Sequence, residues 1–172
     1  NQDLGYIHPG DSLVYPVILP IGQNIFKGGY INALHVDKKG DVWLTYSTQG
    51  LYHVKKKTSN FTSSDDYTME QWTMSEGLVN DILLSAVSDN QGNIWCASFN
   101  KFSIFNTQNN HFRNFKIRQS DNNPFYYNYM IPLTNGNILT NIRGDLIEFD
   151  PTKIQVTKPG NPVILSTITL PD

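Results

Sequence analysis

The chain has 172 residues, a formal net charge of -2 and charged side chains at only 16% of positions, compared with about 25% in typical soluble domains. This charge gives no electrostatic reason to expect nucleic acid or an anionic membrane surface as a partner. No apolar run reaches the roughly 18 to 20 residues of a membrane span, and the first ten residues lack the basic and apolar regions of a signal peptide. We therefore expect a soluble segment of about one domain that does not itself lie in a membrane.

The single cysteine, Cys96, excludes an internal disulfide and a zinc site built from several cysteines. Because Cys96 follows Trp95 in an apolar strand pattern, we expect a buried, inert thiol rather than a nucleophile.

Short strands with period-two alternation follow one another along the chain. The opening, LGYIHPGDSLVYPV, is similar to the segments that begin at Phe102 and Leu146, so residues 1–27 are predicted to be the last strands of a preceding unit. Three units of four strands follow. The predicted strands are 30–36, 42–46, 51–54 and 68–73 in the first unit, 82–88, 94–98, 102–105 and 112–117 in the second, and 126–132, 138–142, 146–149 and 154–157 in the third.

Tight turns separate the first two strands of each unit. Their sequences are DKKG at 37–40, DNQG at 89–92 and TNG at 134–136. Glycine supplies the positive φ angle, and Asp or Asn hydrogen-bonds to its own backbone. The polar run at 55–66 lies between the third and fourth strands of the first unit and is predicted to be an extended hairpin loop, with its three lysines exposed to solvent.

The units repeat at spacings that are typical of β-propeller blades. Trp43 and Trp95 lie 52 residues apart, and Gly92 and Gly136 lie 44 apart. A large flat side chain at the same place in each blade fills the gap between neighbouring blades, so we expect both tryptophans in the core. Leu139 takes this position in the third unit, which indicates a smaller gap or a degenerate blade.

The predicted fold class is therefore all-β, with four-stranded antiparallel propeller blades in an incomplete ring of about three to four blades. Propellers close with roughly four to eight blades. We thus expect either a fragment of a longer protein or a ring completed by several copies. The predicted boundaries are residues 1–27 for the end of a preceding blade, 28–74 for a blade with the 55–66 loop, 75–117 for the next blade, 118–158 for a degenerate blade and 159–172 for an exit strand.

These residues resemble a known repeat family, the two-component regulator propeller. The segments GYINALHVDKKGDVWLTYSTQGLYHV and SEGLVNDILLSAVSDNQGNIWCASFNKFSIFN contain its Asp-x-x-Gly-x-aliphatic-Trp turn, and Gly77 to Asn80 match its Gly-Leu-x-x-Asn lead. The third copy is weaker because Leu133 replaces the aspartate of the turn. The tail NPVILSTITLPD, from Asn161, is similar to the strand that opens the immunoglobulin-like domain of hybrid two-component sensors.

The resemblance implies a periplasmic, extracytoplasmic part of a membrane-anchored bacterial sensor, commonly one that regulates glycan use. A transmembrane helix and a histidine kinase are then expected elsewhere in the parent protein. The expected ligand is a glycan-derived oligosaccharide, and self-association or a homodimer is expected as well.

Propeller topology places the loops between second and third strands on one face, together with those between fourth and first strands. Such loops carry binding sites on rigid all-β scaffolds. The cluster NNPFYYNYM from Asn122 adds tyrosines beside amides, a combination able to stack on a sugar ring, although packing or pore lining is the simpler interpretation of inner-strand tyrosines. The predicted ligand-binding residues are Asn80, Asp81, Asn100, Lys101, Asn122, Asn123, Tyr126, Tyr127 and Arg143.

No catalytic or metal-binding residue and no cofactor are predicted. His8, His35, His53 and His111 fall in different strands without a metal-ligand spacing, and no nucleophile or metalloprotease motif is present. Two alternatives stay open at this point. One is a propeller enzyme acting on polysaccharide as a lyase or hydrolase, which would need convergent carboxylates or a metal site, and the other is a protein-interaction scaffold.

Overall fold

The computed structural model describes residues 4–6, 15–17, 29–57, 66–99, 101–116, 129–142 and 145–154. These residues form strands connected by tight turns, together with short 3-10 turns, and the fold is all-β as predicted. The predicted exit strand at 159–172 and residues 155–157 of the last predicted strand lie outside the described residues, as do 58–65 of the first blade's long loop.

The first sheet has four antiparallel strands in chain order, β3-β4-β5-β6. The strands are β3 (Ile31–Val36), β4 (Val42–Tyr46), β5 (Leu51–Lys56) and β6 (Tyr67–Trp72). The loop predicted at 55–66 begins later than expected, because the β5–β6 ladder continues through Lys55 and Lys56. Trp43 faces His53 across the β4–β5 ladder, and His53 faces Glu70 across the β5–β6 ladder. This register brings together side chains that are 10 to 27 residues apart in the sequence.

The second sheet repeats this arrangement with β7 (Ser85–Ser88), β8 (Ile94–Ala97), β9 (Lys101–Asn106) and β10 (His111–Lys116). β7 begins later than predicted. Before it, the Asn80 side chain accepts a hydrogen bond from the backbone N–H of Ile82, which turns the chain. The short turn η2 (Met74–Glu76) joins the first sheet to the second and is capped by Thr73 and Glu76.

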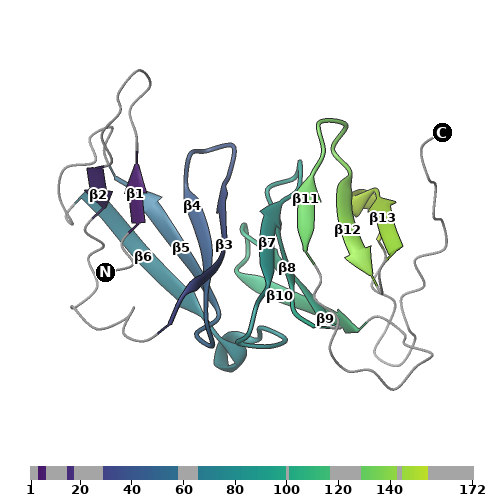
Figure 1. Ribbon diagram of the computed structural model, residues 1–172, viewed down its shortest axis with the longest axis horizontal. Helices are drawn as coiled ribbons and strands as arrows, with labels where there is room; N and C mark the ends of the chain where they lie inside the picture. Colours follow the sequence, from purple (N-terminus) through teal and green to yellow (C-terminus); the bar gives the residue numbers. More distant parts are fainter. Residues whose placement is uncertain are drawn as a thin grey trace.

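The third sheet has β11 (Met130–Pro132), β12 (Ile138–Ile142) and β13 (Asp145–Phe149), followed by the turn η3 (Pro151–Lys153). β1 (Leu4–Tyr6) and β2 (Tyr15–Val17) form a separate two-stranded sheet, which Figure 1 shows at the end of the row opposite to the third sheet. β3 lies beside β7, and β7 beside β11, so the first strands of successive sheets are neighbours. The sheets are consistent with consecutive blades of a partial propeller.

The sheets pack through layers of apolar side chains. The layer between the first and second sheets comprises Trp43, Leu51, Leu78, Leu83, Ala86, Ile94, Cys96, Phe105 and Phe112, with Trp72 against it. The layer between the second and third sheets comprises Val87, Trp95, Ala97, Phe102, Ile104, Met130 and Ile138, with Phe115, Phe149 and Ile154 against it. Both tryptophans are buried between sheets, as predicted.

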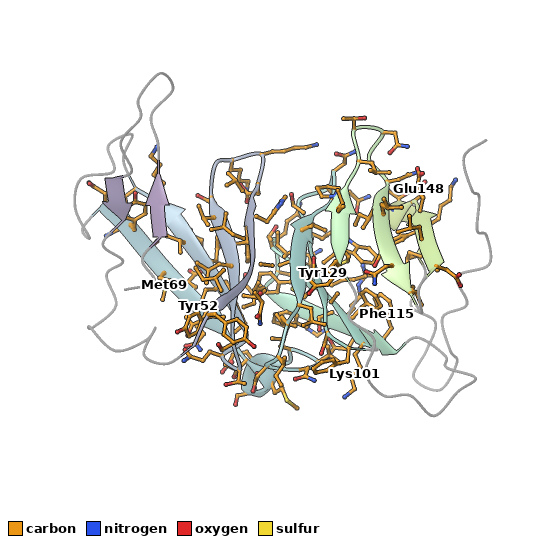
Figure 2. The ribbon with its side chains drawn as sticks, viewed as in Figure 1. Tyr52, Met69, Lys101, Phe115, Tyr129 and Glu148 are labelled. Carbon is orange, nitrogen blue, oxygen red and sulfur yellow. The ribbon has the colours of Figure 1, made fainter. Side chains whose placement is uncertain are left out.

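A third apolar layer covers the other face of the first sheet. It comprises Leu44, Tyr46, Tyr52, Val54 and Tyr67, with Ile31, Val42 and Met69 against it. Figure 2 shows Tyr52 and Met69 on the first sheet, and Phe115 at the opposite end of the row, close to the third sheet. Each of the first two sheets therefore buries both of its faces, which is the packing expected of propeller blades.

Candidate functional site

A carboxylate fixes the first turn of each of the first two blades. One oxygen of Asp37 accepts hydrogen bonds from the backbone N–H groups of Lys39 and Asp41, at 2.8 and 3.1 Å, and the other accepts from the Trp43 indole at 3.0 Å. Asp89 makes the same three contacts with Gln91, Asn93 and Trp95, at 2.9 Å each. The motif thus orients the tryptophan that fills the gap to the next blade.

An aromatic trio occupies equivalent positions in both gaps. In the first gap, Trp43 lies 5.8 Å from Trp72 of the same blade, and Trp72 lies 4.6 Å from Phe105 of the next blade, measured between ring centroids. In the second gap, Trp95 lies 6.1 Å from Phe115 of the same blade and 5.3 Å from Phe149 of the next. These contacts form the rigid floor of each gap.

A cavity of about 330 Å³ opens above the aromatic trio of the first gap. Its wall combines carboxylates, ammonium groups, amides and hydroxyls from both blades over an aromatic floor. The lining residues are Asp37, Lys38, Lys39, Asp41, Trp43, His53, Lys55, Glu70, Trp72, Ser88, Asp89, Asn90, Gln91, Gly92, Phe105, Thr107 and Asn110. A cavity with this lining can bind a small polar molecule or an ion.

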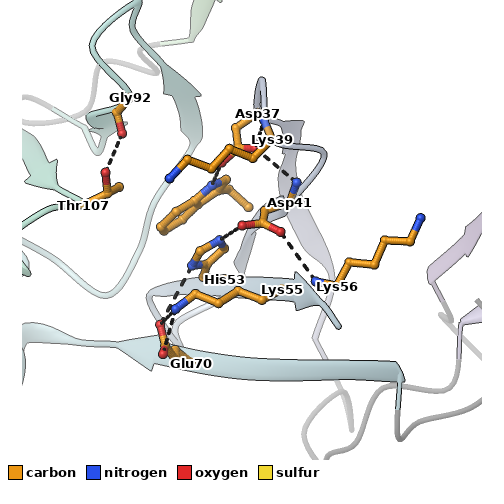
Figure 3. Close-up of polar contacts among 10 residues, drawn as sticks. Asp37, Lys39, Asp41, His53, Lys55, Lys56, Glu70, Gly92 and Thr107 are labelled. Carbon is orange, nitrogen blue, oxygen red and sulfur yellow. Dashed lines mark hydrogen bonds and ion pairs between the residues drawn. The ribbon is translucent and has the colours of Figure 1, made fainter. Parts of the chain in front are cut away.

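A buried histidine lies between two carboxylates in the wall of this cavity (Figure 3). The His53 ring stacks on Trp43 with a centroid separation of 3.6 Å, and its side chain is 8% exposed. Its Nε2 lies 3.2 Å from Oδ2 of Asp41, and its Nδ1 lies 3.9 Å from Oε2 of Glu70. Both Glu70 oxygens accept from Nζ of Lys55, at 2.9 and 2.8 Å.

Burial lowers the pKa of His53, although Asp41 and Glu70 act in the opposite direction. The neutral imidazole is therefore favoured at neutral pH, with one ring nitrogen protonated and the other carrying a lone pair. With Nε2 protonated, such a ring donates a hydrogen bond to Asp41. With Nε2 unprotonated, its lone pair can bind a cation instead.

A second histidine connects the first strands of the two blades. Nε2 of His35 accepts from the backbone N–H of Ser88 at 3.0 Å and lies 2.7 Å from the Ser88 hydroxyl. Burial lowers the pKa of His35, with Asp37 opposing this effect. An unprotonated Nε2 is what the bond from the Ser88 N–H requires.

The cluster around His53 was not predicted from the sequence, because its residues have no metal-ligand spacing along the chain. The β3–β4 turn brings Asp37 and Asp41 together, and His53 joins them through the β4–β5 register, so that one ligand atom from each lies within 4.8 Å of the others. A comparison of equivalent positions in the repeats could have found the cluster, since the second blade has Asn93 and Ile104 where the first has Asp41 and His53.

Three of the predicted ligand-binding residues lie in the described part of the chain. Asn80 makes the turn before β7, and the Asp81 carboxylate accepts from the backbone N–H of Met74 at 2.7 Å. Lys101 lies at the end of the sheets opposite the β3–β4 and β11–β12 turns (Figure 2), on the face that propeller topology assigned to it. The six others lie outside the described residues: Asn100, Asn122, Asn123, Tyr126, Tyr127 and Arg143.

Cys96 is fully buried between the first two sheets, as predicted. Burial raises the pKa of its thiol well above the ordinary range, so the thiol does not ionise near neutral pH. The described segments contain no helix with the length and hydropathy of a membrane span.

No family model and no curated protein matches this chain. Among solved structures, it is similar to the extracellular domain of BT3049 from B. thetaiotaomicron, described as a hybrid two-component system. The TM-score is 0.54 and the identity is 25%, over 70% of this chain and 16% of that one. The extracellular domain of BT4673 from the same organism, described as a hybrid system in one structure and as a one-component system in another, matches over 72% of this chain with TM-scores of 0.57 and 0.54 and identities of 17% and 16%.

The chain spans about one sixth of the length of these extracellular domains. The described sheets therefore have the fold of part of the extracellular domain of a hybrid two-component system, the class of protein that the repeat motif indicated.

Proposed function

We propose that this chain is part of the extracytoplasmic sensor region of a two-component signalling protein and lies in the periplasm. The observation that carries the proposal is the match of 70% of the chain to the extracellular domain of BT3049. The internal repeat also supports the proposal, because the turn, the tryptophan and the aromatic trio recur in successive blades. This observation is independent of the structural match. The proposed role of this segment is to bind a ligand and to transmit the resulting signal. The chemistry of signalling is assigned to a kinase elsewhere in the parent protein.

The gene on both sides of this segment provides the first test. We expect further propeller repeats, then a transmembrane helix and a histidine kinase domain encoded downstream. A reporter enzyme that is active only in the periplasm, inserted directly after this segment in the parent protein, should then be active. A parent gene with neither a membrane span nor a signalling domain would contradict the proposal, and so would an expressed fusion whose periplasm-dependent reporter is inactive.

For the ligand, we propose a glycan-derived oligosaccharide bound at the face that carries Lys101. Asn80 and Asp81 support this face by ordering the loop before β7 through their hydrogen bonds. The tyrosines and amides around Tyr126 are the side chains suited to stacking on a sugar ring and bonding its hydroxyl groups.

Titration of the intact parent ectodomain against an oligosaccharide library tests this ligand assignment. We expect the double variant Tyr126→Ala and Tyr127→Ala to weaken binding at least about tenfold, since each of the two rings contributes about 1 kcal/mol or more by stacking and about 1.4 kcal/mol corresponds to a factor of ten. Thr134→Ala is the control, because Thr134 is an exposed residue of the β11–β12 turn, at the end of the sheets opposite to Lys101. Unchanged binding in the double variant would remove these tyrosines from the site, and turnover of a polysaccharide would indicate an enzyme instead.

A further inference from the structure

We propose that the first blade carries a binding site for a divalent transition metal, with His53, Asp41 and Asp37 as ligands and zinc as the favoured ion. The donor atoms are an imidazole nitrogen and two carboxylate oxygens, which is a donor set that zinc accepts. They lie in the wall of the cavity between the first and second blades. This proposal does not depend on the sensor role.

The distances between the donors suit a single ion. Zinc ligands at about 2.0 to 2.1 Å in tetrahedral geometry are about 3.4 Å apart, and Nε2 of His53 lies 3.2 Å from Oδ2 of Asp41. An oxygen of Asp37 lies within 4.8 Å of both. Asp37 accepts three N–H donors, which leaves one of the roughly four lone-pair positions of a carboxylate free for a metal.

His53 is prepared for ligation by its surroundings. The ring is held in position by stacking on Trp43. Its Nδ1, the nitrogen that does not face Asp41, lies 3.9 Å from Oε2 of Glu70. Metal-binding histidines commonly direct their second nitrogen at a carboxylate or a water, which fixes the tautomer. The adjoining cavity leaves room for one or more water ligands.

The internal repeat shows that these ligands are not required by the blade fold. The second blade keeps the turn aspartate, Asp89, but has Asn93 and Ile104 at the positions of Asp41 and His53. The third blade has Asn137 and Glu148 there, joined by a 2.6 Å hydrogen bond. Only the first of these three described blades combines an imidazole with two carboxylates.

The charge balance of the cavity is compatible with a cation. Lys55 is paired with Glu70, and Lys38 donates to the side chain of Asn90 at 2.6 Å. Both of these ammonium groups are therefore directed at partners other than Asp41. Lys39 adds a third ammonium group to the cavity lining, which holds four carboxylates against these three. Calcium and magnesium are disfavoured, because they need more oxygen ligands than two carboxylates and bind imidazole poorly.

The test is calorimetric titration of the chelator-treated 172-residue chain with zinc chloride, with calcium chloride run in parallel. We expect one zinc per chain, a higher midpoint of thermal unfolding in the presence of zinc, and no comparable effect of calcium. Asp41→Asn and His53→Ile place the second blade's residues in the first blade, and each should weaken zinc binding more than about tenfold.

The control is His111→Asn, which removes an exposed histidine on β10 and should leave zinc affinity unchanged. Circular dichroism of each variant checks that it is folded, and the nearly isosteric Asp41→Asn keeps the test valid if His53→Ile does not fold. No zinc binding by the wild-type chain would overturn the proposal. Zinc affinity that survives in folded Asp41→Asn, or that is lost in His111→Asn, would also overturn it.

Discussion

The aspartate of each turn and the tryptophan six residues later act as one unit. Asp89 accepts from two backbone N–H groups and from the Trp95 indole. In the third blade Leu133 replaces the aspartate, yet the backbone bonds from Leu133 to Asn137 and from Gly136 to Leu133 remain, at 2.8 and 3.0 Å. The tryptophan is absent there as well, so no indole N–H needs an acceptor. The third blade therefore lacks both the indole donor and its carboxylate acceptor, and neither is left without its partner.

We predict that Asp89→Ala lowers the free energy of unfolding by about 2 to 4 kcal/mol, because several donors lose their acceptor and each costs about 1 to 3 kcal/mol when unsatisfied. Asp89→Asn should cost less, since one carbonyl oxygen remains. Urea denaturation followed by tryptophan fluorescence measures both. The exposed Asp145 is the control, and its replacement by alanine should change stability by less than about 0.5 kcal/mol. Equal stabilities of Asp89→Ala and Asp145→Ala would contradict the prediction.

A second prediction concerns the pKa of Glu76 in the capping box. Hydrogen bonds from the Thr73 hydroxyl and backbone N–H, both 2.7 Å, lower this pKa. A lowered pKa stabilises the fold above the ordinary glutamate pKa of about 4.3, and this contribution is lost as the pH falls through the folded value. Thr73→Val should raise the pKa only partly, because the backbone donor remains. NMR titration of the side-chain carboxyl carbon measures it, and identical values in variant and wild type would refute the assignment.

At the scale of the elements, the strands were predictable because alternation and glycine turns are local signals. Gly40, Gly92 and Gly136 all have positive φ, as the turn sequences indicated. The candidate site was not predictable in the same way. His53 meets Asp41 through cross-strand register, and the cavity above them needs side chains from two blades. Register and packing between sheets are not encoded in any short segment.

Two glycines with the same backbone conformation allow a test of close packing. Gly40 and Gly50 have φ of +83° and +80°, but a Cβ at Gly40 would meet no atom within 4 Å, whereas one at Gly50 would collide with the carbonyl oxygen of Trp72. We predict a loss of about 1 to 2 kcal/mol for Gly40→Ala, from backbone strain alone. For Gly50→Ala we predict about 2 to 5 kcal/mol, since overpacking is added. Similar urea unfolding midpoints for Gly40→Ala and Gly50→Ala would show that the backbone carbonyl of Trp72 moves away from the new Cβ.

At the scale of the whole molecule, the described sheets form a row whose two ends do not meet (Figure 1). The first strands of the blades leave apolar side chains in solvent: Leu34 and Val36 on β3 are 48% and 55% exposed, and Ile131 on β11 is 56% exposed. A repeat array without its neighbouring units exposes apolar surface that the neighbours would cover.

We therefore predict that the isolated chain self-associates. Sedimentation velocity over a range of concentrations should show an average mass that rises with concentration. The double variant Leu34→Thr and Val36→Thr places β-branched residues, which suit a strand, at both positions and should shift this rise to higher concentration. A chain that stays monomeric at every concentration would count against an incomplete propeller.

The aromatic trio also has a consequence for synthesis on the ribosome. Each gap takes two rings from one blade and the third from the next, and Phe105 is added 62 residues after Trp43. Phe105 follows Trp72, the last residue of the first blade, by 33 residues, so at about 5 to 20 residues per second the first blade is complete about 2 to 7 seconds before Phe105 is added. During that interval Trp43 and Trp72 lack the ring that completes their packing. A chaperone that binds nascent apolar segments would therefore encounter each blade in turn, in the order of the chain.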